Sequence, residues 1–156
     1  PILHLREAQA LRVLADAGEV MVPSAVDGEL ARLIPDWPNQ RPSWLVVFPP
    51  ARPPDPMVEQ LSRVLGTGES EAIALARSLP ADWLLTDDAE ARAIARLAGI
   101  EVHGSVGVVL WGASTRRLDP QQAHAALENL ARSSLWLSAT ILDEARAALR
   151  EILQRQ

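Results

Sequence analysis

Acidic residues stand in separate segments of the sequence, at positions where folding would bring them to one place. Asp87 and Asp88 directly follow Trp83–Thr86, a short apolar run typical of a strand. In an open parallel sheet, ligands bind beyond the carboxyl ends of the strands, so these carboxylates lie where a functional site is expected. The plain alternative is that Asp88 only caps the helix that begins beside it, which is a common role for Asp.

Glu69 shares its helical spacing with apolar residues downstream. It stands in line with Ala72, Ile73 and Ala76, the pattern of a helix face that packs against a sheet. A helix that precedes a strand and packs on the sheet begins at the carboxyl edge, so we expect Glu69 to point toward the Asp pair. Its neighbour Glu71 is expected to face outward, with the ordinary preference of acids for a first helical turn.

Glu29 repeats this geometry from another segment. It lies between Val26 and Leu33 on the apolar stripe of a helix that follows the strand Val20–Val22. Clustered carboxylates repel one another unless a cation compensates, and their hard oxygen ligands suit Mg²⁺ or Mn²⁺. Such a metal activates water and neutralises charge on a phosphodiester. The acidic residues therefore predict a metal-dependent nuclease centre.

The composition excludes several other chemistries. The chain has no Cys, so thiol nucleophiles, thiolate zinc sites and disulfides are ruled out. It has no Lys, which removes the phosphate-loop lysine and Schiff-base mechanisms. The net charge of -5 argues against a broad surface that coats nucleic acid, but not against a small metal-assisted phosphate site. His4, His103 and His124 show no ligand spacing.

The elements around these residues predict an α/β fold. The strand Trp83–Thr86, the helix Asp88–Ala98 and the strand Ile100–His103 form a βαβ unit, which implies a parallel sheet. The other predicted elements are helices over 5–17, 26–34, 57–65, 69–79, 106–113, 120–132 and 138–153, and strands over 20–22 and 44–48.

Length and composition fit a single domain over residues 1–156, since 48% of the residues are hydrophobic. Residues 35–56 hold eight of the twelve prolines and are expected to form a loop-rich insertion, and residues 120–156 to form C-terminal helices. No apolar run reaches the roughly 18 residues of a membrane helix. We therefore expect a soluble, cytoplasmic protein without a membrane partner.

An ordered set of short motifs runs through nearly the whole chain. The motifs are Pro1–Leu3, Val22–Val26 with Glu29-Leu30, Gly68–Ala76, Leu84–Asp88 with Ala91-Arg92, and Gly104–Val108. This set resembles the PIN-domain family, specifically its DUF3368 branch. Members carry an Asp on a first, central strand that is followed by a Ser-Pro or similar pair, and this chain starts at what would be that proline. We expect such a strand to precede Pro1.

The resemblance implies a three-layer α/β/α fold with a central parallel sheet. It also implies an Mg²⁺- or Mn²⁺-dependent endoribonuclease, a hydrolase that is often the toxin of a toxin–antitoxin pair and cleaves RNA with metal-activated water. Carried over by position, the catalytic residues are Glu69, Asp87 and Asp88. The same three residues and Glu29 bind the metal, with Thr86 and Ser105 as polar support. Arg92 is a candidate for holding phosphate, and equally a solvated helix residue.

Other interpretations stay open from the sequence. An inactive PIN-like module that binds nucleic acid or protein fits the acidic balance. An α/β enzyme acting on a small phosphorylated substrate also places carboxylates at a sheet edge, although the absence of Lys weighs against it. Trp136, Ile141 and Leu142 are expected either to pack onto the sheet or to form a surface for a homodimer or an antitoxin.

Overall fold

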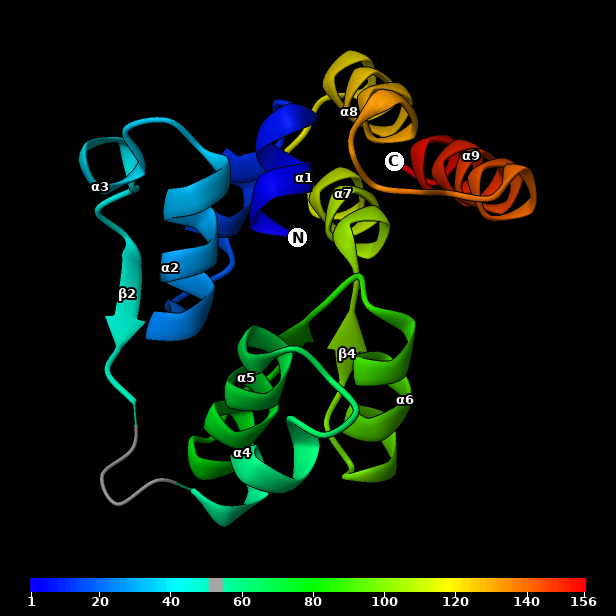
Figure 1. The fold of residues 1–156 in the computed structure, drawn as a ribbon. Helices are drawn as coiled ribbons and strands as arrows, with labels where there is room; N and C mark the ends of the chain where they lie inside the picture. Colours follow the sequence, from blue (N-terminus) through cyan, green and yellow to red (C-terminus); the bar gives the residue numbers. More distant parts are fainter. Residues whose placement is uncertain (51–54) are drawn as a thin grey trace. The chain divides into compact units, whose positions relative to one another are not determined.

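A computed structural model describes residues 1–50 and 55–156 of the chain. The chain divides into two compact units. We call Pro1–Gly18 with His103–Gln156 the helical unit and Glu19–Val102 the mixed unit (Figure 1). Within the described residues, no helix combines the length and the apolar character needed to cross a bilayer. The single domain expected over 1–156 stays a prediction.

The helical unit is organised around one apolar helix. Its elements are α1 (Ile2–Glu7), the 3₁₀ helix η1 (Leu11–Asp16), α7 (Ser105–Ser114), α8 (Pro120–Arg132) and α9 (Ala139–Gln154). Helix α7 contacts all the others, and Val108, Val109 and Ala113 on it are buried. Helix α8 begins at a complete capping box, in which Asp119 and Gln122 accept each other's backbone N–H bonds. The predicted boundaries of α8 are thereby confirmed.

The single helix predicted over residues 5–17 is wrong. Gln9 adopts the left-handed conformation with φ of 58° and separates α1 from η1. The Gln9 and Ala10 N–H groups donate to the carbonyls of Arg6 and Leu5, which is the Schellman pattern that ends a helix. Leu5, Ala10 and Val13 are all buried around this turn, so the apolar spacing reflects burial although the helix is broken.

The mixed unit alternates strands with helices. Its elements are β1 (Val20–Pro23), α2 (Ser24–Leu33), α3 (Trp37–Gln40), β2 (Leu45–Phe48), α4 (Pro56–Leu61), α5 (Thr67–Ser78), β3 (Leu84–Leu85), α6 (Ala89–Leu97) and the beginning of β4 (Val102–His103). Strands β1 and β2 pair in parallel, with Val20 opposite Leu45. Strands β3 and β4 form the other pair. The α/β class and most predicted elements are confirmed.

The strands form two separate pairs instead of one continuous sheet. No strand in residues 1–50 and 55–156 bonds to both pairs. Strands β3 and β4 have only two residues each, shorter than the apolar runs in the sequence suggest. The Leu84 N–H nevertheless donates to the Glu101 carbonyl (2.8 Å), which extends the contact beyond the paired residues.

Several local predictions need correction. The insertion 35–56 contains the short helix α3, which the prolines concealed, and its residues 51–54 lie outside the described part. Helix α4 ends at Leu61, not Leu65; Ser62 is its C-cap residue, and the Ser62 hydroxyl donates to the Val58 carbonyl (2.7 Å). Leu33 is 62% exposed, since α2 buries the face that carries Leu30 instead.

Trp136 does not pack onto a sheet. Its side chain is 83% exposed in the connection between α8 and α9, and Ile141 is 45% exposed at the start of α9. Leu142 is half-buried. The packing alternative is therefore wrong for Trp136.

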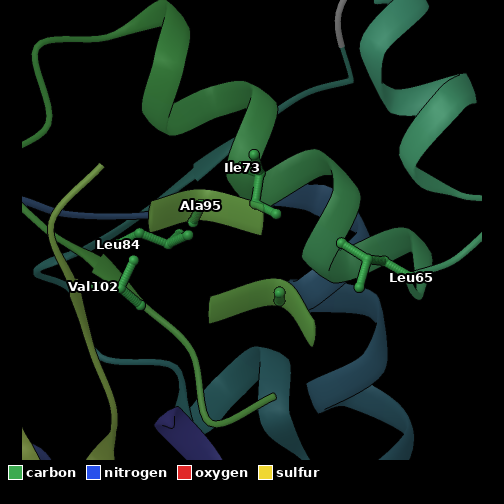
Figure 2. Close-up of a cluster of buried hydrophobic side chains, with 6 residues drawn as sticks. Leu65, Ile73, Leu84, Ala95 and Val102 are labelled. Atoms are coloured by element: carbon green, nitrogen blue, oxygen red, sulfur yellow. The ribbon is translucent and has the colours of Figure 1, made fainter. Parts of the chain in front are cut away.

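A buried cluster fixes α5 against α6 and the strands β3 and β4. Figure 2 shows Leu65, Ile73 of α5, Ala95 of α6, Leu84 of β3 and Val102 of β4, which belong to one buried cluster. Ala72 and Ala76, which share the predicted stripe with Ile73, pack against the same cluster. The predicted inward face of α5 is confirmed, and the cluster determines where the start of α5 lies relative to the end of β3.

Ile73→Ala should destabilise the fold by about 2–5 kcal/mol, because it leaves a cavity at a side chain that is 1% exposed. Val64→Ala, at a side chain that is 63% exposed, should change the stability by less than about 0.5 kcal/mol. Urea unfolding of both variants checks this. Equal effects would contradict the assignment of Ile73 to the core.

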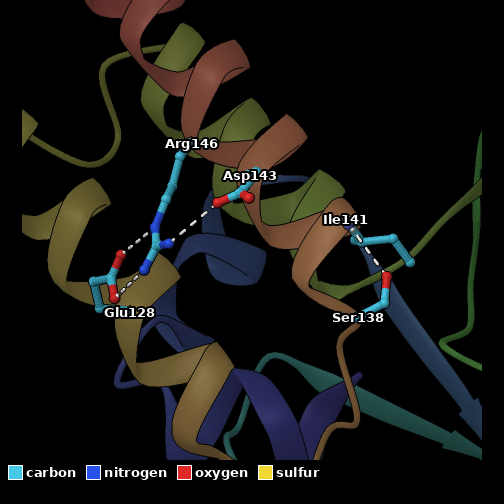
Figure 3. Close-up of polar contacts among 5 residues, drawn as sticks. All are labelled: Glu128, Ser138, Ile141, Asp143 and Arg146. Carbon is cyan, nitrogen blue, oxygen red and sulfur yellow. Dashed lines mark hydrogen bonds and ion pairs between the residues drawn. The ribbon is translucent and has the colours of Figure 1, made fainter.

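An ion pair joins α8 to α9. Arg146 donates through Nε and Nη2 to the two carboxylate oxygens of Glu128, each at 2.8 Å, and through Nη1 to Asp143 at 3.4 Å (Figure 3). The hydrogen bonds from Arg146 lower the pKa of Glu128 below its usual value. In the same view, Ser138 accepts from the Ile141 N–H and caps α9 (3.2 Å).

The Glu128 pair should contribute stability at neutral pH and lose it in acid. Because the pKa of Glu128 is lower in the folded chain than in the unfolded chain, the contribution is present above the ordinary glutamate range and disappears as the pH falls through the folded value. Glu128→Gln should therefore differ from wild type at neutral pH and converge with it in acid, once the pH lies below the folded pKa of Glu128. Thermal unfolding across this range tests the expectation, and a constant difference would contradict it.

Candidate functional site

Glu29 of α2 places its carboxylate against the first turn of α5. Both of its carboxylate oxygens lie 2.9 Å from the point that a Cβ atom on Gly68 would occupy. Gly68 is buried, and helices α2 and α5 contact each other. Glycine at this position therefore leaves the space that the Glu29 carboxylate fills.

Glu69 directs its carboxylate to the same end of α5. Its side chain folds back toward Gly66, the N-cap residue, where an added Cβ would collide with it. Both carboxylates lie at the amino end of a twelve-residue helix, whose dipole favours negative charge. Glu29 and Glu69 are half-buried, and neither forms a hydrogen bond or ion pair with the part of the chain that the structure describes.

Glu71 makes the converse contact, from α5 to the amino end of α2. Its carboxylate accepts a hydrogen bond from the backbone N–H of Ala25, in the first turn of α2 (3.3 Å). The expectation that Glu71 faces outward is therefore wrong. Because α2 is close enough to offer an unsatisfied N–H group, the carboxylate turns toward it instead of toward solvent. Each of the two helices thus carries a carboxylate to the amino end of the other.

Asp88 is the N-cap of α6. Its Oδ1 accepts from the Ala91 N–H (2.7 Å), and the buried Thr86 hydroxyl accepts from the Asp88 N–H (3.2 Å). The capping alternative is confirmed, and Asp88 is exposed at the end of β3. A capping role does not remove the negative charge, so Asp88 keeps a second oxygen for another function.

Asp87, Arg92 and Ser105 have different surroundings. Asp87 is half-buried and takes part in a polar or ionic interaction. Arg92 stands one turn into α6, where its N–H donates to the Asp88 carbonyl (3.1 Å), and its guanidinium has no partner among the residues described. Ser105 is fully buried at the start of α7 in the helical unit, whereas the acidic residues belong to the mixed unit.

The acidic residues converge in part. Glu29 and Glu69 meet at the amino end of α5, while Asp87 and Asp88 lie at the end of β3. Among residues 1–50 and 55–156, no group of three or more acidic, His or Cys side chains is close enough to hold a metal ion. The oxygen donors suit a hard divalent cation, but in the described residues the Glu29 carboxylate fills the space over Gly68 and no complete set of ligands is brought together.

Gly66 and Gly68 are a sequence signal for this arrangement that the acidic residues alone do not give. Gly66-Thr67-Gly68 follows a helix instead of a strand, so it is not a phosphate loop. Its glycines instead make room for the carboxylates of Glu69 and Glu29. Two glycines shortly before an acidic residue at a helix start are the pattern that identifies such an arrangement.

The comparison with known families agrees with this fold. The sequence model of DUF3368, described as a PIN domain, matches residues 1–151. PIN domains are generally nucleases and typically use divalent metals. The chain belongs to the PIN-domain family DUF3368. No protein of curated function and no solved structure matches it.

Two Gly→Ala variants separate helix propensity from carboxylate placement. Gly28→Ala in α2 should stabilise the chain by about 0.5–1 kcal/mol, because nothing lies within 4 Å of its new Cβ. Gly68→Ala should gain less, or lose stability, since its Cβ displaces the Glu29 carboxylate from the start of α5. Denaturant unfolding of both variants measures the difference. Equal gains would show that the Glu29 contact is not held.

Proposed function

We propose that this chain is an endoribonuclease of the PIN type that hydrolyses RNA phosphodiesters with Mg²⁺ or Mn²⁺. The observation that carries the proposal is the Glu29 carboxylate held over Gly68 beside Glu69, with neither carboxylate partnered in the described residues. Uncompensated carboxylates in half-buried positions are costly, and a cation would offset that cost. Nuclease activity is general in the family to which the chain belongs.

The residues divide into separate roles. Glu29 and Glu69 would hold the cation from α2 and α5, with Asp87 or Asp88 contributing from the end of β3. A divalent cation supplies a lowered pKa for bound water and neutralises charge on the phosphodiester. Glu71 keeps α2 and α5 in register by accepting the Ala25 N–H. Arg92 holds a phosphate oxygen of the RNA with its unpartnered guanidinium.

Thr86 has a supporting role in the proposal. Its hydroxyl accepts the Asp88 N–H and so fixes the backbone that presents this carboxylate.

Protein partners are part of the proposal. Trp136 and Ile141 are large apolar side chains left exposed in the helical unit, and they form the proposed surface for an antitoxin protein or a second copy of the chain. The proposed setting is a cytoplasmic toxin–antitoxin pair, in which the partner restrains the ribonuclease.

The second candidate function is a PIN-like binding module without activity. Two observations favour it: no group of three or more acidic, His or Cys side chains in the described residues could hold a metal ion, and Asp88 is already used as a helix cap. The net charge of -5 points toward a protein partner rather than nucleic acid for such a module.

Cleavage of single-stranded RNA in the presence of Mn²⁺ tests the proposal. We expect activity that EDTA abolishes and that falls by at least about a hundredfold in Glu29→Gln, Glu69→Gln and Asp88→Asn, because even the outer partners of metal ligands contribute up to that factor. Asn caps helices as well as Asp does, so Asp88→Asn removes the charge without removing the cap of α6.

Glu90→Gln is the matched control, because Glu90 is an exposed carboxylate in the first turn of α6. It should keep full activity. A folded, Mn²⁺-bound protein that leaves RNA intact would support the binding module instead. Hydrolysis of a small phosphate monoester without RNA cleavage would favour a phosphatase.

A further inference from the structure

A pocket of about 470 Å³ lies entirely within the helical unit, whereas Glu29, Glu69, Asp87 and Asp88 belong to the mixed unit. It is formed by the turn after α1, by η1, by the turn after α7 and by α8. The polar residues in its lining are Arg12, Asp16, Arg117, Gln9, Gln122 and Asn129. Its volume is in the range of roughly 300–1,000 Å³ that is usual for small-molecule sites.

Arg117 is held in place on two sides. Its guanidinium carbon lies 4.5 Å from the centre of the Trp111 ring, and its Nε donates to the Asp16 carbonyl (3.3 Å). Stacking on an aromatic face and a hydrogen bond at Nε together restrict the side chain before any ligand binds. The two terminal nitrogens have no partner among the residues described, so they remain available to an anion.

Arg12 lines the same pocket from η1. It is exposed and makes no ion pair or hydrogen bond through its side chain with the described residues. Asp16 is the carboxylate in the lining and offsets one of the two positive charges. The pocket thus keeps a net positive charge in a chain whose overall charge is -5.

The backbone on both sides of the pocket adopts a costly conformation. Gln9, which lines it, and Arg116, which precedes Arg117, have φ of 58° and 59°. In both turns the N–H groups of this residue and the next follow the Schellman pattern, which usually places glycine at the left-handed position. Keeping non-glycine residues there costs about 1 kcal/mol each.

The apolar floor of the pocket is also fixed. Val13 and Leu118 line it, and their side-chain atoms lie 3.0 and 3.2 Å from where a Cβ on Gly112 would stand. Glycine in α7 therefore lets η1 and the turn after α7 approach closely. Val13 and Leu118 thus form an apolar part of a lining that is otherwise mostly polar.

We infer that this pocket binds a nucleotide. Arg12 and Arg117 hold its phosphate, because two guanidinium groups match the geometry and charge of phosphate oxygens. Val13, Leu118 and the neighbouring alanines contact the base and ribose, and the amides of Gln9 and Asn129 face the polar edge of the base. The volume exceeds that needed by phosphate alone. Nucleotide binding here does not depend on nuclease activity, and the nucleotide is either free or the 5′-phosphorylated end of an RNA strand.

Isothermal titration calorimetry in EDTA tests this, with adenosine monophosphate, inorganic phosphate and a short oligoribonucleotide carrying either a 5′-phosphate or a 5′-hydroxyl. We expect the monophosphate or the 5′-phosphorylated strand to bind, and phosphate alone or the 5′-hydroxyl strand to bind at least about tenfold more weakly. Arg12→Gln and Arg117→Gln should each weaken binding about tenfold. Binding of adenosine monophosphate would show that the ligand is a free nucleotide. Binding of the 5′-phosphorylated strand without binding of adenosine monophosphate would show that it is the 5′ end of an RNA strand.

Arg150→Gln is the charge-matched control, since Arg150 is exposed on α9 and does not line the pocket. It should bind as the unchanged chain does. Ala125→Phe fills the pocket without changing the charge and should abolish binding. No binding of either nucleotide form at millimolar concentration would overturn the inference, and so would equal binding by Ala125→Phe or equal weakening in Arg150→Gln.

Discussion

The exchange of carboxylates between α2 and α5 is the interaction on which the mixed unit depends. Glu29 lies over the first turn of α5, and Glu71 binds the first turn of α2. Each helix end offers unsatisfied N–H groups and a partial positive charge. The partial positive charge at each helix end offsets part of the repulsion between these carboxylates.

The hydrophobic cluster around Ile73 links this exchange to the end of β3. One turn of α5 separates Glu69 from Ile73, and Ile73 packs against Leu84 and Ala95. The same element that presents a carboxylate at its start is therefore anchored, one turn later, against the strand that leads to Asp87 and Asp88. The buried side chains around Ile73 stabilise the packing of α5, and the polar helix ends determine where the carboxylates lie.

The helix ends differ in how well the sequence predicts where each helix stops. Gly99 follows α6 with φ of 77°, and glycine at this position makes the boundary predictable. Gln9 and Arg116 follow α1 and α7 in the same left-handed conformation, but neither residue is a glycine. The sequence therefore does not indicate the end of α1, and apolar spacing predicts a continuous helix through Gln9. That Glu69 points toward the Asp pair stays a prediction. The direction of Glu71 could not be predicted from spacing, because it depends on how closely α2 approaches, which is a tertiary property.

The continuous sheet could not be judged from local pattern either. Apolar runs predict that strands exist, and β1 and β2 pair in parallel as expected. Which strand lies beside which depends on partners distant in the chain. The composition of residues 83–86 does not indicate which strand lies beside them or how many residues pair. In the structure, β3 is limited to Leu84 and Leu85.

The capping bond of Asp88 has an evolutionary consequence. Asn satisfies the Ala91 N–H equally well, so exchange of one oxygen for nitrogen alters charge at this position without disturbing the fold. Under the proposed function, such an exchange would remove a site carboxylate while leaving the fold unchanged. Relatives with Asn at this position would then be candidates for PIN domains that fold normally without nuclease activity.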